Sequence, residues 1–294
     1  MMQADNNKGT DGVSLVATVF NEGDSIAGFA RSIRSQTRRP DEVVIVDGGS
    51  TDGTPEAIRR ELDDAVTLRL IVEPGCNISE GRNRAIAEAR HELIACSDAG
   101  CVLHDDWLEK IVGPLERDES IDVVSGFYEL ECHNLLQRCV GLLTMPGQLD
   151  PPDPERFLPS ARSIAFRREA WRAAGGYPEW LYTGEDTLFD IKLKRMGYRF
   201  HFAGDALVAW EPRPTLRKVA RQFFLYARGG GQLNWNRDAL VWEIRQLPIV
   251  AAIVVGGVFW WPVFLLLPFW FAYQHLVAIH PRARRIARRC GTSR

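Results

Sequence analysis

The stretch Val46-Asp47-Gly48-Gly49-Ser50-Thr51-Asp52-Gly53-Thr54 follows a run of β-branched residues and precedes Pro55 and Glu56. The apolar run predicts a strand, and the glycines predict a turn at its end. Pro at the first helical position and an acid near the positive end of the helix dipole favour a helix that starts at Thr54. This strand-turn-helix unit predicts an α/β fold and places Asp47 at a strand end. A solvated turn with Asp caps is the alternative interpretation.

Strands and helices alternate on both sides of this unit. Apolar runs predict strands over residues 13–20, 42–46, 68–72, 93–96 and 123–128. Helical spacing predicts helices over residues 25–35, 79–89, 106–115, 168–174 and 186–196. This alternation is typical of a mostly parallel sheet with helices on both faces. Ligands of such sheets bind at the carboxyl ends of the strands.

The composition is that of a globular protein with unevenly placed charge. Of 294 residues, 46% are hydrophobic and 25% are charged, which excludes a disordered, collagenous or disulfide-stapled chain. The last fifteen residues carry six Arg and no acid, whereas the rest carries 30 Lys and Arg against 38 Asp and Glu. An acidic body argues against nucleic-acid binding. The basic end suits contact with an anionic membrane.

The cysteines and the N-terminus favour a cytosolic protein. The six cysteines form no CxxC pair, so reduced thiols are expected rather than a structural zinc site. Residues 1–12 are polar, lack an apolar core of a signal peptide, and are expected to be disordered.

The C-terminal region carries the membrane signal. Residues 246–281 contain no Asp, Glu, Lys or Arg. One crossing needs about 20 residues and two need about 40, so a short helical hairpin, spanning or re-entrant, fits best. It would keep the basic tail 282–294 cytoplasmic. Residues 214–245 predict an amphipathic helix at the membrane surface. A buried pair of core helices is the alternative for the apolar stretch.

Motifs narrow the class of protein. The chain has no GxGxxG in its first strand-helix unit and no GxxxxGK[ST], so a dehydrogenase loses its main support and a P-loop ATPase is excluded. Five other segments occur in order: residues 15–22, residues 47–54, Gly81-Arg82-Asn83, Ser97-Asp98-Ala99-Gly100 and Gly184-Glu185-Asp186. In order and approximate spacing they resemble family 2 glycosyltransferases over about residues 13–230. The resemblance implies a GT-A fold with a mostly parallel central sheet, and inverting transfer of a hexose from a nucleotide diphosphate donor.

The resemblance implies that residues 13–130 bind the nucleotide-sugar. Carboxylates there would accept hydrogen bonds from ribose hydroxyl groups or a base N–H. The residues expected in this pocket are Ala17, Thr18, Glu22, Asp47 and Gly49. Arg82 would face the base or the diphosphate, because a guanidinium forks onto phosphate oxygens. An exposed arginine on the first turn of a helix is the alternative for Arg82.

The resemblance also implies a divalent cation, Mg²⁺ or Mn²⁺, on the diphosphate, with Asp98 as its protein ligand. The second acid of the family's Asp-x-Asp is Gly100 here, and Trp210 stands where many relatives have a further His ligand. Asp105 or Asp106 would replace the missing acid only if their loop folds back. Partial replacement of the metal by Arg and Lys stays open.

Residues 131–213 are expected to form the acceptor-side half. Asp186, in the pair Glu185-Asp186 at a helix start, corresponds to the family's catalytic base, which must take a proton from the acceptor hydroxyl. An N-terminal acid without a catalytic role is the alternative. Arg162 is expected to reach the donor phosphates or an anionic acceptor, with a surface arginine as the alternative.

Together these features predict a glycosyltransferase at the cytoplasmic face of the inner membrane, anchored by its C-terminal apolar stretch. Its acceptor would be a lipid-linked sugar or another glycan of the cell envelope. Two alternatives remain: transfer to polyprenyl phosphate, which needs no base, and a catalytically silent protein that binds nucleotide-sugars.

Overall fold

The computed structural model describes residues 12–23, 25–145, 147–148, 152–233, 237–274 and 280–290. The chain forms two compact units, Met1–Glu131 with Pro152–Pro212 and Cys132–Pro151 with Arg213–Arg294. The first unit therefore joins the predicted donor-side half to most of the predicted acceptor-side half. Residues 1–11, most of the tail that was expected to be disordered, lie outside the described residues.

An eight-stranded sheet forms the centre of the first unit, in the order β3-β2-β1-β4-β7-β6-β8-β5. All five predicted strands occur, with ends within two residues of the prediction. The strands are β1 (Val13–Val19), β2 (Glu42–Asp47), β3 (Leu68–Val72), β4 (Leu93–Cys96), β5 (Cys101–Leu103), β6 (Val123–Leu130), β7 (Ile164–Arg167) and β8 (Phe200–Trp210).

The expectation of a mostly parallel sheet is right for only half of it. Strands β3, β2, β1 and β4 are parallel neighbours. Strand β7 is antiparallel to β4 and β6, and β5 is antiparallel to β8, so the sheet as a whole is mixed. Because β7 runs against β4, its first residue Ile164 pairs with Cys96, the last residue of β4. The segment before β7 thereby reaches the carboxyl end of β4.

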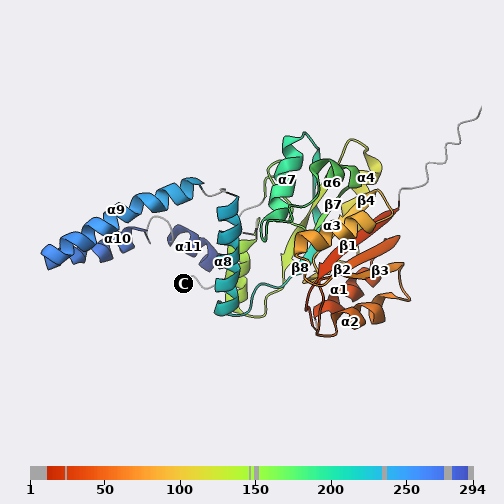
Figure 1. Ribbon diagram of the computed structural model, residues 1–294, viewed down its shortest axis with the longest axis horizontal. Coiled ribbons are helices and arrows are strands. Elements are labelled where there is room, and N and C mark those ends of the chain that lie inside the picture. Colours follow the sequence, from red (N-terminus) through yellow and green to blue (C-terminus); the bar gives the residue numbers. More distant parts are fainter. Residues whose placement is uncertain are drawn as a thin grey trace, which may run out of the picture. The chain divides into compact units, whose positions relative to one another are not determined.

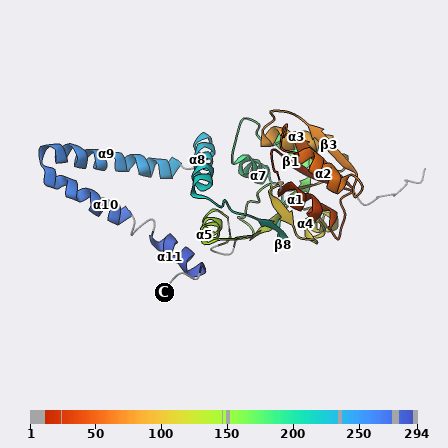
Figure 2. The ribbon, with the colours of Figure 1, turned by 90° about the horizontal axis from the view of Figure 1, so that it is seen from below.

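Helices cover both faces of this sheet (Figures 1 and 2). On one face lie α1 (Ser25–Arg34), α2 (Thr54–Leu62) and α4 (Trp107–Arg117). On the other lie α3 (Ile78–Glu88), α6 (Arg168–Ala174) and α7 (Glu185–Arg195). The five helices predicted from their spacing and the helix predicted to start at Thr54 are confirmed.

Local signals fix two helix starts near the carboxyl ends of the strands. Helix α2 starts at Thr54 with Pro55 in its first turn. Its N-cap residue is Gly53, and the Thr54 hydroxyl donates to the Asp52 carboxylate at 2.6 Å. Helix α3 starts after Asn77, whose side chain accepts the backbone N–H groups of Ser79 and Glu80 while Glu80 accepts that of Asn77. This capping box satisfies the first turn of α3.

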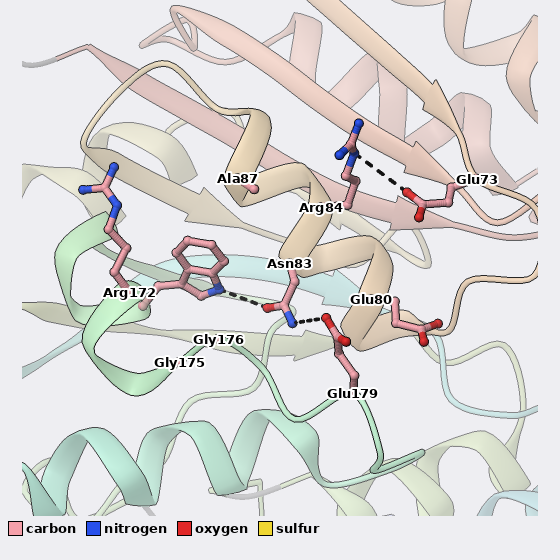
Figure 3. A pocket seen from close by; sticks show the side chains of 10 residues that line it. Glu73, Glu80, Asn83, Arg84, Ala87, Arg172, Gly175, Gly176 and Glu179 are labelled. Carbon is pink, nitrogen blue, oxygen red and sulfur yellow. Dashed lines mark hydrogen bonds and ion pairs between the residues drawn. The ribbon is translucent and has the colours of Figure 1, made fainter.

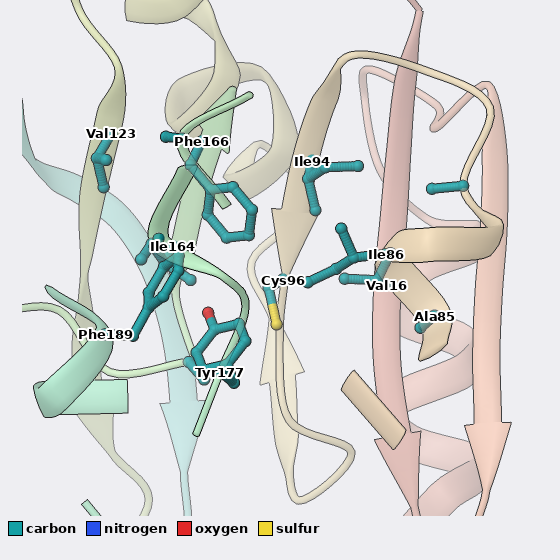
Figure 4. Close-up of a cluster of buried hydrophobic side chains, with 14 of the residues drawn as sticks. Val16, Ala85, Ile86, Ile94, Cys96, Val123, Ile164, Phe166, Tyr177 and Phe189 are labelled. Carbon is teal, nitrogen blue, oxygen red and sulfur yellow. The ribbon is translucent and has the colours of Figure 1, made fainter. Parts of the chain in front are cut away.

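One layer of the core of the first unit lies between the sheet and helices α3, α6 and α7 (Figure 4). Val16, Ile94 and Cys96 project from the strands toward Ala85 and Ile86 of α3, and all five are fully buried. Further along the same face, Phe166 of β7 meets Phe189 of α7, with ring centroids 5.6 Å apart. One apolar layer thus fixes α3 and α7, the two helices that carry predicted site residues.

The second unit is helical in its described residues. It contains α5 (Leu135–Thr144), α8 (Leu216–Gln232), α9 (Arg237–Phe259), the 3-10 helix η1 (Trp261–Leu265), α10 (Leu266–Gln274) and α11 (His280–Arg289). Helix α8 confirms the predicted amphipathic helix and exposes Leu216 and Phe224. Helix α11 contacts α5, where Arg138 donates to the Arg289 carbonyl at 3.0 Å.

The predicted apolar hairpin is only partly found. The chain turns at η1, which begins at Trp261 and has Pro262 as its second residue, so residues 246–274 are not one continuous helix. Residues 275–279 of the predicted segment lie outside the described residues. Over the ranges that the structure describes, we find no helix whose length and apolarity would let it span a membrane.

Candidate active site

The predicted site residues of the first unit gather at the carboxyl ends of β1, β2 and β4. Asp47 is the last residue of β2, and Asp98 lies two residues beyond β4. Arg82 comes from the first turns of α3, and Glu185 and Asp186 from the start of α7. This is the edge at which sheets of this kind bind ligands.

Asp47 shapes the turn after β2. Its side chain is fully buried, and its carboxylate accepts the backbone N–H of Ser50 at 3.0 Å and the Ser50 hydroxyl. Gly49 follows with φ 91°, and a Cβ there would lie 3.0 Å from the backbone of Pro74. Glycine is needed on both counts. Contact between Asp47 and a nucleoside stays a prediction, since the carboxylate already bonds the turn.

The end of β1 and the start of α3 touch. A Cβ on Gly81 would lie 2.5 Å from Cγ2 of Thr18, so only glycine allows this approach. The Thr18 hydroxyl is buried and has no hydrogen-bond partner among the described residues. Ala17 beside it is buried, and the half-buried Glu22 donates its backbone N–H to the Thr54 hydroxyl oxygen, at 3.1 Å. Their part in nucleotide binding stays a prediction.

Arg82 is buried inside the first unit, in surroundings that the sequence analysis did not predict. Its side chain is 2% exposed, and its guanidinium lies between two carboxylates. Nη2 is 3.0 Å from Asp98 Oδ1, and Nη1 is 3.2 Å from Glu185 Oε1. The ends of the guanidinium are therefore used inside the protein, and Arg82 connects α3, the segment after β4 and α7. The exposed alternative is therefore wrong, and contact between Arg82 and a nucleotide stays a prediction.

Tyr177 completes the surroundings of Arg82, although no sequence motif predicted this contact. The guanidinium carbon lies 4.8 Å from the Tyr177 ring centroid, and this ring stacks on Phe189 of α7 at 4.3 Å. Cation–π contact of this kind favours a buried guanidinium. The neighbour of Arg82, Asn83, holds the backbone of Tyr177 by donating to its carbonyl at 2.9 Å and accepting its N–H at 2.8 Å.

The start of α7 presents two carboxylates with different surroundings. Glu185 is buried against Arg82, and burial together with the Asp186 charge raises the pKa of Glu185 to about 7, although Arg82 acts in the opposite direction. Asp186 is half-buried, and its carboxylate accepts the N–H groups of Thr187 at 2.7 Å and Ala161 at 3.4 Å. Of the predicted catalytic pair, Glu185 is thus enclosed and Asp186 is the more accessible, and a catalytic role for either stays a prediction.

A third carboxylate of α7 escaped the sequence analysis. Asp190 is one turn beyond Asp186 and 1% exposed, and neither of its oxygens has a hydrogen-bond partner among the described residues. Burial, reinforced by the charge of Asp186, raises the pKa of Asp190 well above its ordinary value. A buried carboxyl without a partner stays protonated.

Asp98, the predicted metal ligand, lies between two arginines. Besides Arg82, the Nε of Arg162 is 3.9 Å from Asp98 Oδ2, and the Arg162 guanidinium lies over the Trp210 ring at 5.1 Å. Asp105 and Asp106 do not supply a second acid, since they bond Ser35 and Lys110. Within the described ranges, no three His, Cys, Asp or Glu side chains are grouped so that they could hold a metal ion. The donor set therefore does not form a metal site by itself.

A cavity of about 690 Å³ lies on the outer side of α3 (Figure 3). Asn83 forms its floor, where it receives the Trp171 indole N–H at 3.0 Å and donates to Glu179 at 2.9 Å. Glu80, Arg84 and Arg172 are among its other lining residues. None of the predicted site residues lines it.

Comparison with known proteins agrees with this geometry. The model of glycosyl transferase family 2 matches residues 14–151, and that of glycosyl transferase family group 2 matches residues 154–281. The N-acetylglucosaminyl-diphospho-decaprenol L-rhamnosyltransferase of Mycobacterium tuberculosis is 35% identical over 291 residues, which cover 80% of this chain and 90% of that protein. The succinoglycan biosynthesis protein ExoA of Rhizobium meliloti is 27% identical over 251 residues, which cover 83% of this chain and 76% of ExoA.

Among solved structures, the mannosyltransferase PcManGT of Pyrobaculum calidifontis, in complex with GDP-Man and Mn²⁺, has the same fold. The TM-score is 0.62 at 22% identity, and the match covers 97% of this chain and 88% of that one. The GT-A-like fold is thereby confirmed.

Proposed function

This chain belongs to glycosyl transferase family 2 and is a glycosyltransferase, and we propose that it moves one sugar from a nucleotide diphosphate donor to a hydroxyl group of a lipid-linked or glycan acceptor. The observation that carries this proposal is Asp186, a half-buried carboxylate at the start of α7, at the ligand-binding edge of the sheet. The donor class is supported by PcManGT, which was solved with GDP-Man. The acceptor class is supported by the decaprenol-linked sugar in the name of the rhamnosyltransferase.

In the proposed reaction, Asp186 takes the proton of the acceptor hydroxyl while that oxygen attacks the anomeric carbon. The bond from this carbon to the diphosphate breaks, its electron pair goes to the phosphate oxygen, and the configuration inverts. The N–H groups of Thr187 and Ala161 hold the Asp186 carboxylate in place. Arg82 and Glu185 fix the start of α7 behind it. PcManGT, solved with Mn²⁺, supports a divalent cation in the family. Of the residues that the structure describes, Asp98 would hold it, but no group of three ligating side chains surrounds that position, so no step is assigned to a metal.

The location belongs to the same proposal: the enzyme works at the cytoplasmic face of the inner membrane, held there by its second unit. Support comes from two features of that unit. Apolar side chains of the η1 region are largely exposed, among them Val258, Phe259, Trp260, Trp261 and Phe269. Helix α11 carries basic side chains and no acid, which suits anionic headgroups. Deletion of residues 246–294 should release the protein from membranes, and a protein that still sediments with them would contradict this anchor.

The reaction is tested by release of nucleoside diphosphate from UDP-, GDP- and dTDP-sugars, with a polyprenyl-lipid extract as acceptor source. One donor should turn over, and Asp186→Asn should abolish this turnover. Undiminished turnover in Asp186→Asn would favour a polyprenyl phosphate acceptor, because a phosphate needs no base. Nucleotide binding without turnover of any donor would favour the silent alternative.

A further inference from the structure

Arg162 lies beside Asp98 and brings a positive charge to this carboxylate. It precedes β7, which carries it to the carboxyl end of β4. Its Nε lies 3.9 Å from Asp98 Oδ2, and its guanidinium covers the Trp210 ring at 5.1 Å. Its side chain is 21% exposed, in contrast to the enclosed Arg82.

Three hydrogen bonds hold the segment around Arg162. The Ser97 hydroxyl donates to the Arg162 carbonyl at 2.8 Å, and Arg162 Nη1 donates to the Ser160 hydroxyl at 3.3 Å. The preceding residue, Ala161, donates its N–H to Asp186 at 3.4 Å. One short segment thus borders both Asp98 and the proposed base, and it holds the Arg162 guanidinium beside Asp98.

The two positions that would complete a metal site are filled in a way that favours this arginine. Residue 100 is a glycine whose Cβ position meets no atom within 4 Å, so a second carboxylate is absent although space exists for it. Position 210 holds a tryptophan, which cannot ligate a metal but supports a guanidinium by cation–π contact. The tryptophan at position 210 therefore takes the place of a metal ligand and supports the cation of Arg162.

We propose that Arg162 provides the positive charge for the donor diphosphate beside Asp98, and that this chain binds its nucleotide without a divalent cation. The inference rests on the proposed function, since it assigns a role within that donor site. A guanidinium suits the task because its fork matches phosphate oxygens and it is always charged. During transfer it neutralises the charge that the leaving diphosphate gains when the bond to the anomeric carbon breaks.

The test is calorimetric binding of UDP, GDP and dTDP to the full chain, in EDTA and with Mg²⁺ or Mn²⁺. One nucleotide should bind equally well in both conditions. Arg162→Met should weaken its binding about tenfold or more in both, the loss expected for a charge-assisted contact. Arg162→Lys, which keeps the charge without the fork, should lose less and guards against a folding defect. Arg156→Met, an exposed arginine of the same region, should bind as the unchanged chain does.

A gain-of-function variant gives an independent readout. Gly100→Asp combined with Trp210→His restores two potential ligands, so nucleotide affinity should now rise when Mn²⁺ is added. Binding that EDTA abolishes in the unchanged chain, or that survives in Arg162→Met, overturns the inference and leaves the transferase intact. Absence of nucleotide binding under every condition overturns the proposed function together with the inference.

Discussion

Arg82 Nη1 lies 3.2 Å from Glu185 Oε1, and this contact joins helix α3 to the first residue of helix α7. The same guanidinium reaches Asp98 at 3.0 Å. Donor-side and base-side carboxylates thus share one buried cation. The proposed base, Asp186, is the residue after Glu185, so its position depends on this buried contact.

Replacement of Arg82 should separate catalysis from nucleotide binding. Arg82→Lys keeps one charge but cannot reach both carboxylates with a planar fork, so α7 should shift and kcat should fall about a hundredfold. The donor KM should change little, because Arg82 faces the protein interior. Arg84→Lys, on the exposed side of the same helix, is the control. A selective loss of donor affinity in Arg82→Lys would restore the phosphate-ligand role.

Asp186→Asn should lower kcat by about 10²–10⁴-fold, the usual contribution of a general base. Its amide is isosteric, and its single oxygen can still accept the N–H group of Thr187, the shorter of the two hydrogen bonds. Nucleotide affinity, measured by calorimetry, should therefore match the unchanged chain. Asp64→Asn, at an exposed site beyond α2, controls for loss of a charge. Equal loss of affinity and turnover would mean that Asp186 binds the donor.

Asp190→Asn should flatten the pH dependence of stability. The folded-state pKa of Asp190 is raised well above its ordinary value by burial, so its contribution is complete below that ordinary value and is lost as pH rises through the folded pKa. Asparagine stays neutral throughout. Melting temperatures at pH 5, 7 and 9 should fall less steeply in the variant than in the unchanged chain. Identical slopes would show that Asp190 does not hold its proton when folded.

Gly176→Ala should destabilise the first unit more than Gly197→Ala does. Both glycines have positive φ, 79° and 89°, so each alanine costs about 1 kcal/mol in backbone strain. Only at position 176 would the Cβ meet a neighbour, Asn83 Oδ1 at 2.8 Å, whereas position 197 is open. Displacement of the hydrogen bonds of Asn83 should lower the free energy of unfolding by about 1–3 kcal/mol more, and urea unfolding would measure this difference. Equal losses would show that Asn83 adjusts freely.

The sequence predicted what local patterns determine. Apolar spacing predicted the strands of residues 13–96, Pro55 the start of α2, and the Glu185-Asp186 pair the start of α7. The structure confirms these elements within a few residues. Asp47 and Asp98 lie at the carboxyl ends of β2 and β4, as expected for residues that end or follow predicted strands.

What the sequence missed depends on residues far apart in the chain. The direction of β7 is decided by pairing with β4, across a long connection. The burial of Arg82 requires Tyr177 and Glu185, both about a hundred residues away, and a single arginine after a glycine carries no signal of that. The partnerless Asp190 likewise looks like any polar residue on a helix.

The strand order has a consequence for synthesis on the ribosome. Strand β8 is the last strand made, yet it lies between β6 and β5, and β7 separates β4 from β6. Strands β3, β2, β1 and β4 have their mutual partners once residue 96 has emerged, whereas β6 must wait for β7 at residues 164–167 and β5 for β8 at residues 200–210. A nascent chain halted near residue 151 therefore exposes the open edge of β4, and chaperones that shield such edges would act in that interval.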